Sequence, residues 1–215
     1  MLILRFFAVF GALHISLGRC LARAYAWIWG RLELRWFDHR FDFLQGPGFW
    51  YWQERGVLGR QSITEGGMVL DLCCGDGFYD SVYFGDRAGT LHAVDREPEV
   101  IRRARKFYKK TNVEYFVSDV VQNPFPSTGY DTILCFSALQ QIEGQALQGL
   151  LLKVHQALNP GGVFFGSISV LSSSERFKSE TDVRLSLESY FPSVKLFASK
   201  WPLGRTEWYF ECRKR

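Results

Sequence analysis

The residues best suited to chemistry lie in the stretch from Val69 to Gly77, which reads Val-Leu-Asp-Leu-Cys-Cys-Gly-Asp-Gly. Its apolar start is typical of a buried parallel strand. Gly75 and Gly77 follow, and glycine lets a backbone turn sharply and lets a ligand approach it closely. The carboxylate of Asp71 suits a ligand that carries ammonium or hydroxyl groups better than one that carries phosphate groups. This stretch predicts a ligand-binding loop.

Two further acids follow expected strands. Asp95 comes after the strand expected at 90–94, and Asp119 comes after the strand expected at 113–117. In an open parallel sheet the ligand lies across the carboxyl ends of the strands. Asp95 also lies 20 residues beyond Gly75, a spacing that suits an acid binding ribose hydroxyls. At this point a nicotinamide dinucleotide and an adenosine-type ligand both fit, and each acid could instead cap a helix.

The loop distinguishes between these ligands. Dinucleotide-binding loops carry G-x-G-x-x-G, and here Asp80 stands where the third glycine would fall. Asp71 and Asp76 also disfavour a pyrophosphate beside the loop. The favoured ligand contains adenosine, lacks phosphates and has a positive end, and S-adenosylmethionine (SAM) meets all three conditions. A nicotinamide oxidoreductase is the disfavoured alternative.

From about Gln61 to its C-terminus the chain resembles the class I SAM-dependent methyltransferases. The resemblance is carried by five segments in the family's order and spacing, namely 69–77, 93–95, 118–126, 130–136 and 158–163. It implies an α/β, Rossmann-like fold. The expected sheet has seven strands in the order 3-2-1-4-5-7-6, with strand seven antiparallel and helices on both faces.

The resemblance also implies a binding site for SAM. Asp95 would bind the ribose hydroxyls, and Arg96 would lie beside the adenine. Asp119 and the backbone of Val120 would read the adenine edge, while Phe136 would supply backbone near the sulfonium. The methionine part would be bound by the end of the first strand and its loop: Asp71, Cys73, Cys74, Gly75 and Gly77.

Two positions depart from the family's pattern. Cys73 replaces the first glycine of the loop motif, and we expect it to have a negative φ. Gln140 and Gln141 stand where relatives often have histidine or Glu-His. A general base is needed only for a hydroxyl or a protonated amine acceptor, and the candidates are His39, Tyr51 and Gln141. A SAM-binding protein of this fold without transferase activity is the alternative function.

The expected elements alternate between strands and helices after residue 61, which predicts a parallel sheet covered on both faces. Further strands are expected at 68–73, 131–136, 163–169, 194–200 and 207–213. Helices are expected at 79–84, 99–108, 144–158 and 181–190. We therefore expect a methyltransferase domain at 61–215 preceded by an extension at 1–60.

The extension is basic and aromatic. It holds eight of the Arg residues, four acids and five of the seven Trp, whereas residues 61–215 are charge-neutral. Residues 1–18 are strongly apolar, but the uncharged run at 6–18 is too short for a spanning helix, which needs about 20 residues. Two interpretations stay open: a hydrophobic helix packed on the domain or on a second subunit, or an interfacial membrane contact through residues 1–36. The run 49–52 is either core or the roof of a substrate pocket.

The totals limit partners and location. A net charge of +4 over 215 residues is too weak to indicate a nucleic-acid partner. The five Cys show no zinc-ligand spacing, so we expect no metal and reduced thiols in a cytoplasmic protein. Because residues 61–215 carry no net charge, the favoured acceptor is a small molecule with an oxygen or nitrogen nucleophile. We expect it to be apolar or lipid-like. A homodimer stays open.

Overall fold

The computed structural model describes residues 17, 20, 47–142, 144–170, 177–201 and 205–215. The chain divides into two units, 1–54 and 55–215. The boundary falls inside helix α2 (Pro47–Ser62), whose first turn contains Pro47 as the sequence predicts. Most of the extension at 1–60, including His39, therefore lies outside the described residues.

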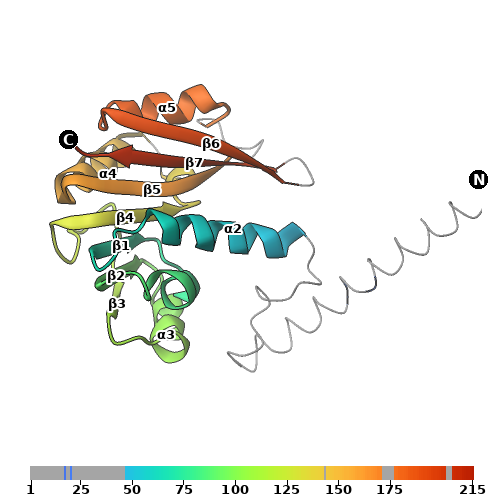
Figure 1. The fold of residues 1–215 in the computed structure, drawn as a ribbon, viewed down its shortest axis with the longest axis vertical. Helices are drawn as coiled ribbons and strands as arrows, with labels where there is room; N and C mark the ends of the chain where they lie inside the picture. The colour runs from blue at the N-terminus through green and yellow to red at the C-terminus, as the bar shows by residue number, and fades with distance from the viewer. Residues whose placement is uncertain (1–16, 18–19, 21–46, 143, 171–176, 202–204) are drawn as a thin grey trace, which may run out of the picture. The chain divides into compact units, whose positions relative to one another are not determined.

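Seven strands form one sheet in the order β3-β2-β1-β4-β5-β7-β6, which confirms the predicted topology. Figure 1 shows them side by side, with β3 at one edge and β6 at the other. Strand β7 runs antiparallel to both of its neighbours, and the other described pairings are parallel. The strands are β1 (Met68–Leu72), β2 (Thr90–Asp95), β3 (Val113–Val117), β4 (Tyr130–Phe136), β5 (Leu158–Val170), β6 (Ser193–Trp201) and β7 (Arg205–Arg213).

The helices follow local signals in the sequence. Pro98 lies in the first turn of α3 (Pro98–Phe107), and α4 (Gly144–Ala157) ends before a Pro-Gly-Gly turn. A capping box between Ser179 and Asp182 starts α5 (Glu180–Glu188). The helix expected at 79–84 is a single π-helical turn, η4 (Asp80–Phe84), and a short 3₁₀ turn, η5 (Leu139–Gln141), follows β4.

The two faces of the sheet have different cores, because alternate residues of a strand point to opposite faces. One face contributes Leu70, Ile133 and Phe164 to a cluster with the buried side chains of α4 and α5. The other face is aromatic. There the Phe136 ring lies 6.0 Å from the Phe84 ring and 6.0 Å from the Phe165 ring.

In the part of the chain that the structure describes, each helix is too short or too polar to cross a lipid bilayer. The interfacial contact expected through residues 1–36 lies outside the described residues, apart from positions 17 and 20.

Candidate active site

A cavity of about 510 Å³ opens at the carboxyl ends of β1 to β4. This is the edge at which open parallel sheets bind their ligands, and the volume is in the range of small-molecule sites. Six of the ten SAM-binding residues that the sequence predicts line it: Cys73, Asp95, Arg96, Asp119, Val120 and Phe136. Gln141 lines it as well. The cavity therefore brings together residues that are up to 68 positions apart in the sequence.

Asp95 joins the end of β2 to the glycine loop. Its Oδ2 accepts a hydrogen bond from the Gly75 backbone N–H at 3.0 Å, and its Oδ1 accepts one from the Glu97 N–H at 3.0 Å. The carboxylate thus orders the loop and the turn before α3, and it also lines the cavity. Asp95 therefore caps the turn before α3 and also lies on the wall of the cavity.

Asp119 is similar at the end of β3. Its Oδ1 accepts hydrogen bonds from the Val121 N–H at 2.8 Å and the Gln122 N–H at 3.3 Å, and the residue lines the cavity beside Val120. Arg96 is exposed and pairs with Glu97, with 3.4 Å between Nε and Oε1. This end of the cavity is therefore polar and open to solvent.

The glycine loop adopts the left-handed backbone that its motif requires. Gly75 and Gly77 have φ values of +62° and +79°. Cys73 has a φ of +59°, so the expected negative φ is wrong. It takes the conformation of the glycine that it replaces, at a cost of roughly 1–2 kcal/mol. Burial raises the pKa of its thiol to about 12, so Cys73 is protonated at neutral pH.

Asp71 and Asp80 form a buried carboxyl pair beside this loop. Their side chains are 3% and 0% exposed. Burial raises the pKa of Asp71 to about 7, while a hydrogen bond with Asp80 opposes that shift and the nearby Asp95 adds to it. Burial, followed by the charge of Asp71, raises the pKa of Asp80 well above its usual value. We conclude that Asp80 stays protonated, so that its carboxyl can donate a hydrogen bond to the Asp71 carboxylate.

Four predicted residues do not line the cavity. Asp71 lies in β1, and Cys74, Gly75 and Gly77 lie in the loop after it, where the Cys74 N–H bonds to the Val94 carbonyl at 3.0 Å. Among the base candidates, Tyr51 lies in α2 with its side chain outside the described residues. Gln141 donates to the Ser137 carbonyl at 3.3 Å.

The sequence interpretation missed several groups around the cavity. The additional lining residues are Glu97, Ser118, Val121, Gln122, Ser137, Ala138, Ile142 and Ala146. It also missed Arg55 and Glu207, which are 152 positions apart and form a buried ion pair of 3.0 Å that contacts Ser137. Two histidines do not line the cavity: His92 bonds to the Tyr130 hydroxyl at 2.9 Å within the sheet, and the His155 ring packs on Phe191.

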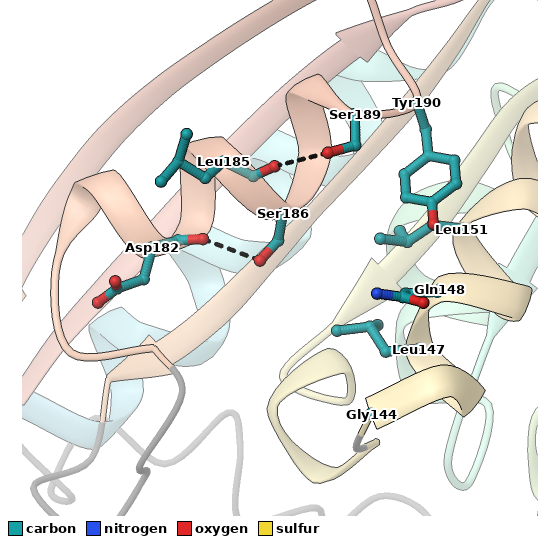
Figure 2. A pocket seen from close by; sticks show the side chains of 9 residues that line it. All are labelled: Gly144, Leu147, Gln148, Leu151, Asp182, Leu185, Ser186, Ser189 and Tyr190. Atoms are coloured by element: carbon teal, nitrogen blue, oxygen red, sulfur yellow. Dashed lines mark hydrogen bonds between the residues drawn. The ribbon is translucent and has the colours of Figure 1, made fainter.

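A second hollow of about 420 Å³ lies between α4 and α5 (Figure 2) and shares no lining residue with the first. Its hydroxyls are used locally: Ser186 donates to the Asp182 carbonyl and Ser189 to the Leu185 carbonyl. The Asp182 carboxylate accepts hydrogen bonds at the start of α5. This hollow offers few groups for chemistry.

The part of the chain that contains this site is similar in sequence to known proteins. The model of a methyltransferase domain family matches residues 69–162. An uncharacterized methyltransferase of Synechocystis sp. is 33% identical over 104 residues, which cover 48% of this chain and 47% of that protein. The malonyl-[acyl-carrier protein] O-methyltransferase of Serratia marcescens is 29% identical over 111 residues, covering 52% and 42%. The chain thus spans about half the length of these curated relatives.

The fold agrees with these matches. The crystal structure of the N-methyltransferase NodS from Bradyrhizobium japonicum, in complex with S-adenosyl-L-homocysteine, superposes with a TM-score of 0.62 at 16% identity. The match covers 76% of this chain and 87% of NodS. Residues 69–162 therefore match a methyltransferase domain family in sequence, and the chain has the fold of the class I SAM-dependent methyltransferases, whose cosubstrate is SAM.

Proposed function

We propose that this protein transfers a methyl group from SAM to an oxygen or nitrogen atom of a small-molecule acceptor. The observation that carries the proposal is the cavity at the carboxyl ends of β1 to β4, with the carboxylates of Asp95 and Asp119 on its wall. Carboxylates at these positions accept hydrogen bonds from the hydroxyl and amino groups of an adenosine.

The residues present fit SAM better than a phosphate-bearing nucleotide. Asp71, Asp76 and Asp80 lie at or near the loop, and Asp71 and Asp80 are buried. Asp80 is protonated and adds no charge, but negative charge on Asp71 and Asp76 would repel a pyrophosphate and attract the ammonium of a methionine tail. This charge distribution supports the choice of SAM over a nicotinamide dinucleotide.

The residues have separable roles in the proposed reaction. Asp95 would bind the ribose, Asp119 and Val120 the adenine, and Phe136 would present backbone beside the sulfur. The methionine end would be bound by Asp71, Cys73, Cys74, Gly75 and Gly77. When bound, SAM supplies an electrophilic methyl group on a sulfonium. The chain's contribution is to align the reactants and exclude water, since an in-line displacement depends mainly on alignment.

The acceptor class follows from the charge of the domain and from the name of a relative. Residues 61–215 carry equal numbers of basic and acidic residues, which favours a small molecule over nucleic acid. The Serratia relative is named for methylating an oxygen of a malonyl group on acyl-carrier protein, which favours an oxygen nucleophile here too. We assign the choice of an apolar or lipid-like acceptor to the aromatic extension at 1–60.

One observation favours the alternative, a SAM-binding protein without transferase activity. The cavity-lining residues within the described ranges include no histidine or lysine to act as a general base. Fold alone does not fix function. An acceptor whose nucleophile is already deprotonated, such as a carboxylate, needs no base and reconciles this observation with transfer.

The test is to incubate the full chain with SAM and a panel of carboxylic acids, phenols, alcohols and amines, and to follow S-adenosylhomocysteine by mass spectrometry. We expect its formation to depend on one acceptor class, together with a product heavier by one methylene. Binding of SAM without turnover of any acceptor would favour the alternative. Absence of SAM binding would contradict the proposal itself.

A further inference from the structure

Lys153 of α4 binds the turn that follows β3. Its ammonium donates hydrogen bonds to the backbone carbonyls of Val120, of Val121 at 3.4 Å and of Asn123 at 2.8 Å. An ammonium group has three protons to donate, so these carbonyls match its full capacity. The same nitrogen lies 4.7 Å from the centre of the Phe125 ring. One side chain of α4 therefore fixes a turn that lies about 30 positions earlier in the sequence.

Asp119 binds the same turn from the side of its N–H groups. Its Oδ1 accepts hydrogen bonds from the N–H groups of Val121 and Gln122. The peptide group that joins Val120 to Val121 therefore has its carbonyl on the ammonium and its N–H on the carboxylate. The next peptide group has the same two partners. A cation on one side and an anion on the other fix the orientation of two consecutive peptide groups.

These peptide groups belong to the wall of the cavity. Asp119, Val120, Val121 and Gln122 all line it. Lys153 is absent from the lining residues that the structure describes, so it acts on a ligand through the turn. Burial lowers the pKa of Lys153, and the charge of Asp119 opposes that shift. The two charged groups therefore interact across the turn as well as through its peptide groups.

We propose that Lys153 is a positioning residue for the adenine of SAM, and that it acts by fixing the turn at 119–123. This inference rests on the proposed function, in which Asp119 and the backbone of Val120 read the adenine edge. Hydrogen bonds depend on direction as well as distance. A turn with fixed peptide groups therefore distinguishes adenine from a base that presents other groups on the same edge, and it loses this selectivity when the ammonium is removed.

Two ligands that differ only in the base test this role. S-adenosylhomocysteine carries adenine. S-inosylhomocysteine carries hypoxanthine, in which a carbonyl oxygen replaces the amino group and the neighbouring ring nitrogen bears a proton. Its edge therefore presents an acceptor where adenine has a donor, and a donor where adenine has an acceptor. Calorimetry measures the affinity of the full chain for both ligands, in the wild type and in Lys153→Met, which keeps an unbranched apolar side chain and removes the ammonium.

Lys214 provides a matched control. Its ammonium also donates to backbone carbonyls, those of Gln156 at 3.3 Å and Leu158 at 2.6 Å. Leu158 pairs with Tyr130, the first residue of β4, whereas the cavity lies at the other end of that strand. Lys214→Met therefore removes the same kind of hydrogen bond from a place away from the cavity.

We expect the wild type to bind S-adenosylhomocysteine at least about tenfold more tightly than S-inosylhomocysteine. Lys153→Met should weaken S-adenosylhomocysteine by roughly tenfold and S-inosylhomocysteine by less than about twofold. Lys214→Met should change neither affinity by more than about twofold. A melting curve verifies folding of each variant, and Lys153→Gln, which also lacks the charge, replaces Lys153→Met if the methionine variant does not fold.

Equal weakening of both ligands in Lys153→Met, or weakening of neither, would overturn the role of Lys153 and leave the proposed function intact. Equal binding of the two ligands by the wild type would overturn it in the same way, because the adenine edge would then not be read. If the wild type binds neither ligand, the proposed function fails and the inference fails with it. The two failures are therefore distinguishable.

Discussion

At the β2–β3 end of the cavity the polar groups come from strand ends and exposed turns, whereas at the β4–β5 end they are buried in a network of four segments. Asp95 and Asp119 each bond to backbone within a few residues or within the adjacent loop. Glu207, by contrast, bonds to side chains 152, 70 and 38 positions away. One end is specified by local motifs and the other by tertiary packing.

Because of this difference, we expect the carboxylates at the β2–β3 end to affect ligand affinity and Glu207 to affect folding stability. Removing a carboxylate at the motif-specified end takes away ligand contacts and a few loop hydrogen bonds that water can replace. Removing Glu207 leaves the Arg55 charge buried without its partner, in a site with little access to water. Loss of a carboxylate should therefore lower the free energy of unfolding much more at the β4–β5 end than at the β2–β3 end.

Glu207→Ala should give the largest effect. Breaking a buried ion pair from one side costs about 3–5 kcal/mol of unfolding free energy, because the remaining charge stays buried. Asp119→Ala, the matched carboxylate at the other end, should cost about 1 kcal/mol. Urea unfolding followed by circular dichroism measures both. Similar losses for the two variants would contradict the division of the cavity into two kinds of end.

Within the motif-specified end, Gly77→Ala should be the most damaging glycine substitution. A Cβ at Gly77 would lie 2.6 Å from the Tyr115 hydroxyl, so we expect a loss of about 2–4 kcal/mol from the left-handed backbone and the clash together. Gly75→Ala has no atom within 4 Å of the new Cβ and should cost only about 1–2 kcal/mol, the backbone penalty. If both variants unfold at the same urea concentration, the clash with Tyr115 does not contribute to the loss of stability.

The Asp71–Asp80 pair predicts a pH dependence of stability. Because burial raises the pKa of Asp71 to about 7, the folded state binds more protons than the unfolded state between about pH 4 and 7. The stability that this proton contributes is fully present below about pH 4 and is lost as the pH rises through about 7. Each unit of raised pKa corresponds to about 1.4 kcal/mol. Arg55, Asp76 and Asp95 also act on the pair.

Asp80→Asn should reduce this dependence. The amide is neutral at every pH and can still donate to Asp71, but the variant lacks the proton that the folded wild type binds at Asp80. We expect the unfolding free energy of the variant to fall less than that of the wild type between about pH 5 and 8, by roughly 1–2 kcal/mol. Chemical unfolding at a series of pH values measures this, and parallel pH profiles would rule out a proton shared by the pair.

Much of the fold and the motif-specified end of the site could be predicted from the sequence. Alternating strands and helices predicted a parallel sheet, the family resemblance implied its strand order, and most expected element bounds lie within two residues of the observed ones. Strand β5 is an exception. It starts at Leu158, but its continuous pairing with β4 begins at Val163, the predicted start. These features are local, because a strand end, a glycine turn and the acid after it are adjacent in sequence.

The rest depends on contacts between distant segments. Glu207 is one of two acids in the terminal strand, and nothing near it in sequence identifies Arg55 as its partner. The sequence pattern identified Asp80 only as the residue that stands in place of the third loop glycine. Its protonation follows from burial beside Asp71, which the order of residues in the sequence does not reveal. The positive φ of Cys73 was mispredicted because the loop geometry outweighs the preference of its side chain.

The most direct test of the central claim, that the cavity binds SAM through the motif-specified end, is calorimetric titration of SAM into the wild type, Asp95→Ala and Glu114→Ala. Glu114 is an exposed residue of the neighbouring strand β3 and serves as the control. We expect the wild type and Glu114→Ala to bind SAM alike, and Asp95→Ala to bind it more weakly by roughly 1–3 kcal/mol. Unchanged affinity in Asp95→Ala, or no binding to the wild type, would contradict it.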